Sequence, residues 1–261
     1  MELNKKMNNN TPHIIYVNGI QYQLGNLKGN TIHYDFDKIL EYLNVKGKLL
    51  FGDNFKIYQD DIQIIYKLCL YTIQDEANCK KYNIDINKGL LLTGPVGCGK
   101  TTLMKLIRHI VPHKRQYQII PCRNAVFSFN HLGYKTIEDY GNDGFYCFDD
   151  LGVEPTGRHY GKDCNVMGEI LLSRYELFTR TSHPKQSRRF SLSHSCHPAL
   201  DAGSPHYKHL ITKSQKPTLT HATTNLNAQE LEERYGNRVR SRMRQLFNLM
   251  AFDQMNKDKR I

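Results

Sequence analysis

Apolar and polar residues alternate along this chain in blocks that predict strands separated by helices. From residue 89 onward, short apolar runs such as GLLLTG predict buried strands. Stretches with apolar residues three and four positions apart predict helices, as Met167, Ile170 and Leu171 do in NVMGEILLSRYELFTR. Strands that alternate with helices are typical of a parallel sheet covered on both faces, so we expect an α/β fold.

The same pattern places the other elements of the main domain. Strands are predicted at YQIIPC, GFYCFDD and TLTHATTNL, and helices at TTLMKLIRHI, NAVFSFNHLG and TIEDYG. The stretch NAQELEERYGNRVRSRMRQLFNLMAF predicts a helix, a break at Gly236, a second helix and a short apolar end. We expect these elements to form one core over residues 86–252.

Residues 13–85 predict a small α+β region in front of this core. In IIYVNGIQYQL, two β-prone runs flank Asn18 and Gly19, which is a strong short-range signal for a hairpin. The apolar pattern of 36–52 predicts a helix, and we expect this helix to break near Gly47.

Two acidic residues precede the next predicted helix, DIQIIYKLCLYTIQDEANCKKY. Asp60 and Asp61 are placed to cap it. At the two ends of the chain, residues 1–12 are polar and rich in asparagine, and 253–261 follow the core, so we expect both segments to form tails, the first of them disordered.

Composition and charge narrow the function classes. Hydrophobic residues make up 39% of the 261 residues, which is enough for a core, and the net charge of +11 favours a polyanionic partner such as nucleic acid. The seven cysteines are scattered without a Cys-x-x-Cys pair, so neither a disulfide framework nor a zinc ribbon is indicated. The start of the chain lacks the pattern of a signal peptide, and no apolar run would span a bilayer. We expect a cytoplasmic protein without a membrane partner.

A phosphate-binding motif follows the first predicted strand of the core. Residues 94–101 read GPVGCGKT and match G-x-x-x-x-G-K-[ST] at every fixed position. Glycines let successive backbone N–H groups point at one phosphate cluster, and the following helix adds the positive end of its dipole. Lys100 is expected to reach the β- and γ-phosphates of ATP, and the Thr101 hydroxyl to bind Mg²⁺. The predicted ATP-binding residues are Gly94, Pro95, Val96, Gly97, Cys98, Gly99, Lys100, Thr101 and Thr102.

Two carboxylates end the strand predicted at GFYCFDD. A buried parallel strand brings such residues to the carboxyl edge of the sheet, beside the phosphate-binding loop. Asp149 is expected to hold Mg²⁺ through water, and Asp150 to orient or deprotonate the attacking water. An ordinary solvated Asp-Asp turn is the alternative, and the upstream loop disfavours it. Cys98 is expected to be a small residue that fits the loop, although a thiol next to a helix N-terminus is in a position that favours oxidation.

Four motifs, in this order, resemble those of the DnaC/IstB-like AAA+ ATPases, which are bacterial helicase loaders and transposition ATPases. They are GLLLTGPVGCGKTTLMKL, FDDLGVEP, THATTNL and ELEERYGNRVRSRMR, and the resemblance covers residues 36–180 and 217–252. It is similar in character to the loader-like ATPases of Bacteroidetes genomes and their mobile elements. The resemblance implies an AAA+ core, ATP with Mg²⁺, self-association into an oligomer, DNA (single-stranded or duplex) and a partner that is a replicative helicase or a transposase.

The resemblance also implies roles for residues beyond the phosphate-binding loop. Asn225 matches the sensor that positions water against the γ-phosphate, with Thr223 and Thr224 as the next candidates. Arg242 matches the arginine finger that reaches the ATP of a neighbouring subunit, and Arg238 lies four residues before it. We expect one helical face with Arg234, Arg238 and Arg242 to serve a subunit interface, and Arg240 and Arg244 to be free to contact DNA phosphate. A solvated helix whose arginines pair with Glu230, Glu232 and Glu233 is the alternative.

The chain departs from the family pattern at three points. An Asp-Asp pair stands where many AAA+ proteins carry Asp-Glu, so we expect slow turnover that DNA or a partner stimulates. Little sequence follows the arginine helix, so we expect no full C-terminal lid and name no second sensor arginine. The N-terminal region lacks the cysteine cluster of some helicase loaders.

Residues 181–217 interrupt the core between a helix and the predicted sensor strand. They hold six basic side chains and one acidic one, nearly half of the net charge of +11, and no hydrophobic periodicity. A neutral, disordered insertion is the favoured interpretation, because closing a long loop costs little. A basic DNA-binding arm is the second. The third is a zinc site, whose candidate ligands are Cys196, His194, His197, His206 and His209.

Three functions remain open on the sequence. The leading one is an ATPase that acts on DNA and loads or remodels a helicase or assists a transposase. The second is a module in which ATP switches binding to DNA or a partner with negligible hydrolysis. A P-loop kinase for small molecules is the third, and it is disfavoured because no substrate-lid pattern is present.

Overall fold

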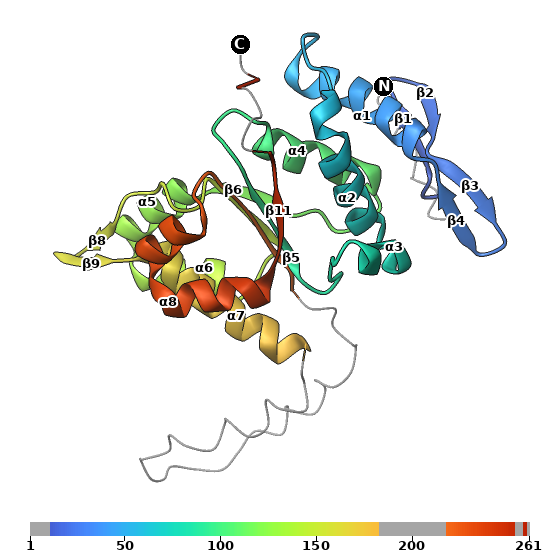
Figure 1. Cartoon of the computed structure of the whole chain (residues 1–261). Coiled ribbons are helices and arrows are strands. Elements are labelled where there is room, and N and C mark those ends of the chain that lie inside the picture. The colour runs from blue at the N-terminus through green and yellow to red at the C-terminus, as the bar shows by residue number, and fades with distance from the viewer. Residues whose placement is uncertain (1–10, 183–217, 254–257, 260–261) are drawn as a thin grey trace, which may run out of the picture.

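A five-stranded parallel sheet forms the centre of the computed structural model, which describes residues 11–182, 218–253 and 258–259 (Figure 1). The strand order is β11-β5-β10-β7-β6. These strands are β5 (Gly89–Thr93), β6 (Gln118–Pro121), β7 (Tyr146–Asp149), β10 (Thr220–Thr224) and β11 (Phe247–Ala251). The predicted parallel α/β sheet is confirmed. The short apolar end of the core is its edge strand, because β11 pairs along the whole of β5.

Helices cover both faces of this sheet (Figure 1). Leu90 and Leu92 of β5 pack into one apolar core with the helices before the sheet, while Leu91 packs into a second core on the other face. This alternation explains why β5 is apolar throughout, as expected for a strand buried on both sides. The helices that follow β5 are α4 (Lys100–Ile107), a 3₁₀ turn (Arg108–Ile110), α5 (Cys122–Leu132), α6 (Tyr134–Gly141), α7 (Val166–Ser182) and α8 (Ala228–Leu246).

The N-terminal region begins with two hairpins. β1 (Ile14–Val17) and β2 (Ile20–Gln23) pair antiparallel across Asn18 and Gly19, which have φ angles of 48° and 82°. The predicted hairpin is therefore confirmed, with the positive φ angles that this turn needs. A second hairpin, β3 (Gly25–Lys28) and β4 (Thr31–Tyr34), was not predicted, because its side chains are mostly exposed and carry little apolar alternation.

The predicted break at Gly47 is wrong. Helix α1 (Phe36–Phe51) runs through Gly47 without interruption. A Cβ at this position would lie 2.0 Å from Cε1 of Phe55, so the glycine lets an aromatic ring pack directly on the helix backbone. The residue serves close packing, which local sequence does not reveal.

The next predicted helix is divided in two. α2 (Ile62–Ile73) follows a 3₁₀ turn (Gln59–Asp61) and ends at Gln74, whose φ of 64° is left-handed; α3 (Glu76–Lys81) then begins at its own cap, Asp75. The expected capping role of Asp61 is also wrong, because its side chain makes no cap hydrogen bond to α2. Its carboxylate instead forms an ion pair with Lys259.

A buried arginine connects helix α7 to the start of β10. Arg174 of α7 is fully buried, and its guanidinium donates to the carbonyl oxygens of Asp143 (2.6 Å), Gly144 (3.1 Å) and Leu219 (3.1 Å). Its Nε also donates to Oγ1 of Thr220, 2.8 Å away. Burial lowers the pKa of Arg174 to about 10. The start of β10 is thereby held against α7.

The predicted insertion 181–217 lies almost wholly outside the described residues. Only its first two residues are described, and they belong to α7, which ends at Ser182. A short hairpin of β8 (Gly157–His159) and β9 (Lys162–Cys164) precedes α7 and was not predicted; it projects at one end of the molecule (Figure 1). Among the described residues, no helix is both long and apolar enough to cross a bilayer.

Candidate nucleotide site

The phosphate-binding loop connects the carboxyl end of β5 to α4. Gly97 and Gly99 have φ angles of 79° and 101°, in the left-handed region that favours glycine. The exposed Val96 lies between Pro95 and Gly97. Because α4 begins at Lys100, the unpaired N–H groups of its first turn face this loop. The predicted loop therefore has the form of an anion-binding site.

Lys100 binds the backbone of its own loop. Its Nζ donates to the carbonyl oxygens of Gly94 and Pro95, each 2.8 Å away, and the side chain is buried. A bound phosphate would give this ammonium a charged partner in place of two neutral carbonyls, and charged hydrogen bonds are stronger. The side chain is thus already placed over the loop.

The second predicted acid lies beside the helix that follows the loop. Oδ1 of Asp149 accepts hydrogen bonds from the hydroxyl of Thr101 and from the hydroxyl of Thr223, each at 2.7 Å. The structure therefore brings together Thr101 and Asp149, the two residues predicted to bind Mg²⁺. A hydroxyl and a carboxylate are ligands that suit this hard cation, so the residues present fit the metal.

Thr223 also fixes the acid that follows. The backbone N–H of Asp150 donates to the Thr223 hydroxyl at 3.0 Å, and the N–H of Leu151 donates to the Thr223 carbonyl at 2.8 Å. Asp150 adopts a left-handed φ of 56°, which turns the chain sharply at the end of β7. Its side chain is exposed. The turn that presents this carboxylate is held by β10.

Thr223, one of the two alternative sensor candidates, is the residue of β10 whose side chain contacts Asp149. Asn225 lies just beyond β10, and its Oδ1 is buried without a hydrogen-bond partner among the described residues. Buried polar atoms are nearly always paired, so this amide is a group available to a ligand. Thr224 is committed elsewhere, since its hydroxyl donates to the Leu151 carbonyl at 2.6 Å.

Cys98 lies in the loop as a buried side chain whose surroundings do not favour oxidation. The residue is buried, and burial raises the pKa of its thiol, although the nearby Lys100 acts in the opposite direction. A raised pKa reduces the thiolate fraction at neutral pH and with it the reactivity. The residue fits the loop as a small apolar side chain.

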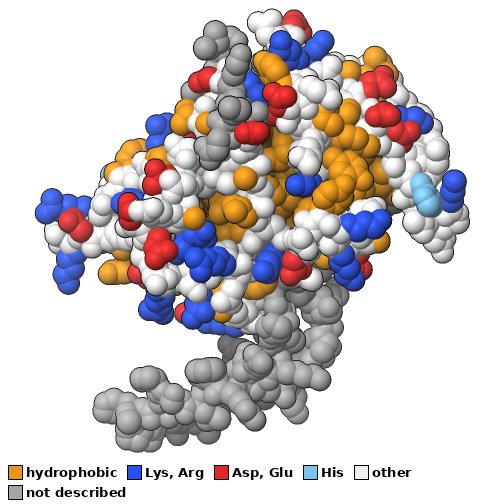
Figure 2. Space-filling view, viewed as in Figure 1, with side chains coloured by type: hydrophobic (Ala, Val, Ile, Leu, Met, Phe, Trp, Pro, Cys, Tyr) orange, Lys and Arg blue, Asp and Glu red, His pale blue; other side chains and the backbone are white. Residues whose placement is uncertain are grey.

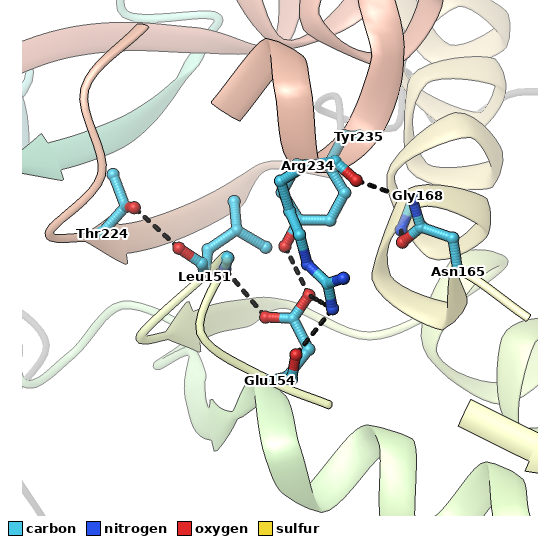
Figure 3. Close-up of polar contacts among 8 residues, drawn as sticks. Leu151, Glu154, Asn165, Gly168, Thr224, Arg234 and Tyr235 are labelled. Atoms are coloured by element: carbon cyan, nitrogen blue, oxygen red, sulfur yellow. Dashed lines mark hydrogen bonds and ion pairs between the residues drawn. The ribbon is translucent and has the colours of Figure 1, made fainter. Parts of the chain in front are cut away.

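A buried glutamate links the acidic turn to the arginine helix α8 (Figure 3). The carboxylate of Glu154 accepts hydrogen bonds from the hydroxyl of Tyr235 (2.6 Å) and the N–H of Gly152 (2.8 Å). Arg234 donates to the Glu154 carbonyl at 2.6 Å and lies 3.5 Å from its carboxylate. Arg234 is therefore bound within its own subunit.

The expected common face of three arginines is consequently wrong. Gly236 interrupts α8 with a φ of 81°, as the predicted break requires, so Arg234 precedes the break and Arg238 and Arg242 follow it. Arg238 is exposed. Arg242 is half-buried, with its guanidinium 4.5 Å from the ring centroid of Tyr175 and 3.4 Å from its hydroxyl.

The two arginines predicted to contact DNA also lie after the break. Arg240 is half-buried, and its Nε lies 3.4 Å from the Ala228 carbonyl; burial lowers its pKa. Arg244 is exposed. Figure 2 shows lysine and arginine side chains gathered over the region of α8. The arrangement offers a basic surface at this part of the core.

A pocket of about 320 Å³ opens beside the phosphate-binding loop. Gly99 and Thr102 line one side of it, while Phe55, Tyr58 and Lys259 line the other. Sequence reasoning named only the loop residues, because nothing local in the N-terminal region signals a pocket wall. Aromatic walls next to a phosphate site suit the stacking of a planar ring.

The candidate zinc ligands, Cys196 and the four histidines around it, lie outside the described residues. Within the described part of the chain, no group of three or more His, Cys, Asp or Glu side chains is arranged to hold a metal ion. The Thr101–Asp149 pair is thus a partial ligand set, as expected for Mg²⁺, which keeps several waters and takes ligands from substrate phosphates.

No protein-family model matches the chain. Among solved structures it resembles a crystal structure of the DnaC helicase loader, with 16% identity, 77% of this chain and 95% of that chain covered, and a TM-score of 0.45. It also resembles AMPPCP-bound DnaA from Aquifex aeolicus, with 14% identity, 79% of this chain and 51% of that chain covered, and a TM-score of 0.42. A provisionally named ABC transporter ATP-binding protein of Methanosarcina acetivorans is 46% identical over 46 residues, which are 17% of this chain and 7% of that protein.

Proposed function

We propose that this protein is an AAA+ ATPase that binds ATP with Mg²⁺ at the loop 94–102 and hydrolyses it. The observation that carries the proposal is the hydrogen-bonded set of Thr101, Asp149 and Thr223 beside Lys100. It joins the ends of two strands, β7 and β10, to the first turn of α4 at one edge of the sheet, which is where α/β folds bind nucleotides. Lys100 binds the β- and γ-phosphates, and Thr101 and Asp149 hold the metal, which neutralises charge on the phosphates when bound.

Asp150 and Asn225 complete the hydrolytic side of the site in this proposal. Asp150 orients the attacking water or takes its proton, and the amide of Asn225 contacts the γ-phosphate or that water. The unpaired Oδ1 of Asn225 supports the second role, because a buried polar atom needs a partner. A carboxylate one methylene shorter than glutamate makes slow turnover the expected behaviour.

Substitution of Lys100 tests the nucleotide proposal directly. Lys100→Ala is expected to abolish measurable phosphate release and to weaken binding of ATP–Mg²⁺, whereas Lys105→Ala, an exposed lysine on the same helix, leaves both unchanged. Wild-type turnover in the Lys100→Ala protein refutes the assignment. Tight ATP binding by the wild-type protein without any phosphate release, even with DNA added, favours the ATP-switched binding module instead.

We further propose that the site is completed by a neighbouring copy of the chain, with Arg242 as the transition-state arginine and Arg238 as its assistant. Arg238 is exposed and Arg242 half-buried on the part of α8 that follows Gly236. In a mixing experiment, Arg242→Ala and Lys100→Ala are each inactive alone, and their mixture regains activity because some interfaces pair an intact loop with an intact arginine. An Arg242→Ala protein that is active alone, or a mixture that stays inactive, contradicts the role.

DNA is the proposed polyanion, and a replicative helicase or a transposase is the proposed partner. The net charge of +11 and the basic side chains over α8 support the first part. Arg240→Ala with Arg244→Ala is expected to weaken DNA binding and to reduce its salt dependence. Anisotropy with single-stranded and duplex oligonucleotides measures this, and purification of the native complex from the host identifies which partner is present.

A further inference from the structure

The last residues that the structure describes lie on the phosphate-binding loop. The backbone N–H of Lys259 donates to the Gly97 carbonyl at 3.1 Å, and its Nζ donates to the Cys98 carbonyl at 2.9 Å. The carboxylate of Asp258 packs against Gly97, where a Cβ would overlap it. A segment from the end of the sequence therefore contacts the loop through both backbone and side chain.

Lys259 also binds the N-terminal region. Its Nζ lies 2.5 Å and 2.7 Å from the two carboxylate oxygens of Asp61, so one ammonium bridges the loop and the 3₁₀ turn that precedes α2. The ion pair is nearly enclosed, with 15% of the Lys259 side chain and 8% of the Asp61 side chain exposed. Exposed ion pairs contribute little, whereas loss of one member of a buried pair leaves an uncompensated charge.

The pair lies in the wall of the 320 Å³ pocket beside the loop, with Tyr58 next to it. The ammonium is 5.2 Å from the ring centroid of Tyr58 and 5.5 Å from that of Phe252. The 320 Å³ of the pocket is open space with Lys259 in place, so the Lys259 side chain forms part of the wall and does not fill the pocket. The pocket borders Gly97, Gly99 and Thr102, so it adjoins the loop that is proposed to bind the phosphates.

We infer that Lys259, together with Asp61, closes the nucleoside side of the nucleotide pocket and is a positioning residue for nucleotide binding. This inference rests on the proposed function, because it assumes a nucleotide at the loop. Lys259 acts by holding Asp61 and the Cys98 carbonyl in place, which keeps α2, the loop and the aromatic wall together around the base and ribose. Lys259, which is distant in sequence from the loop, thus supplies a wall of the pocket.

If Lys259 has this role, its loss weakens binding of the nucleoside part of the ligand more than binding of the phosphate part. Loss of the wall exposes the base and ribose to water but leaves the loop amides and Lys100 available to phosphate. Lys259→Met also leaves the Asp61 carboxylate without its partner, a negative charge that repels phosphates. The double variant Asp61→Asn with Lys259→Met removes both charges, so it tests the wall alone.

Calorimetric titration of the full chain with ADP–Mg²⁺ and with tripolyphosphate–Mg²⁺ tests the inference. ADP is expected to bind roughly tenfold more weakly, or worse, in both variants, the loss that a missing charged hydrogen bond produces. Tripolyphosphate affinity in the double variant is expected to stay within about threefold of wild type. Lys80→Met is the matched control, because Lys80 forms an exposed ion pair with Glu76 on α3; it should change neither affinity.

Four results overturn the inference. Unchanged ADP affinity in both variants shows that Lys259 is not part of the pocket, and tighter ADP binding shows that the segment blocks the site. Equal losses for ADP and tripolyphosphate in the double variant show that the loop itself is distorted. A wild-type protein that binds no ADP refutes the proposed function and this inference with it, whereas wild-type binding with unaltered variants refutes only this inference.

Discussion

Thr223→Val removes one hydroxyl from the centre of the candidate site and keeps the shape of the side chain. Thr223 is fully buried, and its hydroxyl donates to the Asp149 carboxylate at 2.7 Å and accepts from the Asp150 N–H at 3.0 Å. Valine makes neither bond. The substitution therefore removes the side-chain bonds of β10 to Asp149 and Asp150 without opening a cavity, while the backbone bond from the Leu151 N–H to the carbonyl of residue 223 remains.

The two bonds set the size of the effect. A hydrogen bond to a charged group contributes about 1.5–3 kcal/mol and a neutral one about 0.5–1.5 kcal/mol, so Thr223→Val is expected to lower the free energy of unfolding by about 2–4 kcal/mol. Misplacement of Asp150 is expected to reduce kcat by about 10- to 100-fold, which corresponds to about 1.4–2.7 kcal/mol in the barrier. ADP affinity should change by less than about threefold, because the hydroxyl faces Asp149 and not the loop.

Urea unfolding and steady-state phosphate release measure the two effects separately. Thr136→Val is the matched control, because Thr136 is equally buried and its hydroxyl has no hydrogen-bond partner among the described residues. Replacing an unsatisfied hydroxyl with a methyl group should leave stability unchanged or raise it. If Thr223→Val turns over at the wild-type rate, the placement of Thr223 as the residue that fixes the acidic turn is refuted.

Three further substitutions test the packing around the site. Gly47→Ala should destabilise the protein by about 1–3 kcal/mol in a denaturant titration, because the added methyl group overlaps Phe55; a gain in stability from better helix propensity would contradict this packing. Tyr235→Phe removes a buried donor from Glu154 and should cost about 1–3 kcal/mol in the same assay, and a loss below about 0.5 kcal/mol would show that the bond is unimportant. Burial lowers the pKa of His221 to about 3, so the unfolded chain takes up a proton near pH 6.5 that the folded protein refuses. Stability should fall by up to about 5 kcal/mol as the pH drops from 6.5 to 3, and urea midpoints of His221→Asn should show a smaller fall; an identical pH profile would refute this cause.

Local pattern was sufficient for the parts of the fold that depend on neighbouring residues. The hairpin at Asn18 and Gly19, the glycine-rich loop and the break at Gly236 each require positive φ angles, which a few residue types adopt readily. The buried strands show as apolar runs because both faces of the sheet are covered. Each of these features depends on residues that are adjacent in the sequence.

Features that depend on distant residues were not predictable. Gly47 looks like a helix break until Phe55 is seen to pack on it, and Asp61 looks like a cap until Lys259, from the other end of the sequence, binds its carboxylate. The partner of Asp149 on β10 was not predictable for a related reason. Three polar residues follow one another at the end of β10, and only the pairing of that strand with its neighbours decides that Thr223 meets Asp149.

Arg174 has a consequence for how this protein tolerates change in its gene. By binding Leu219 and Thr220 from the middle of α7, it fixes the start of β10 whatever length of chain joins them. Thr223, which binds the acidic turn, lies three residues along β10 from Thr220, so this anchor separates it from codons added or deleted between α7 and β10. Natural changes in the length of this connection, or an inserted reporter domain, are therefore expected to leave the candidate site in place. That site lies at the opposite edge of the sheet from the contacts of Arg174.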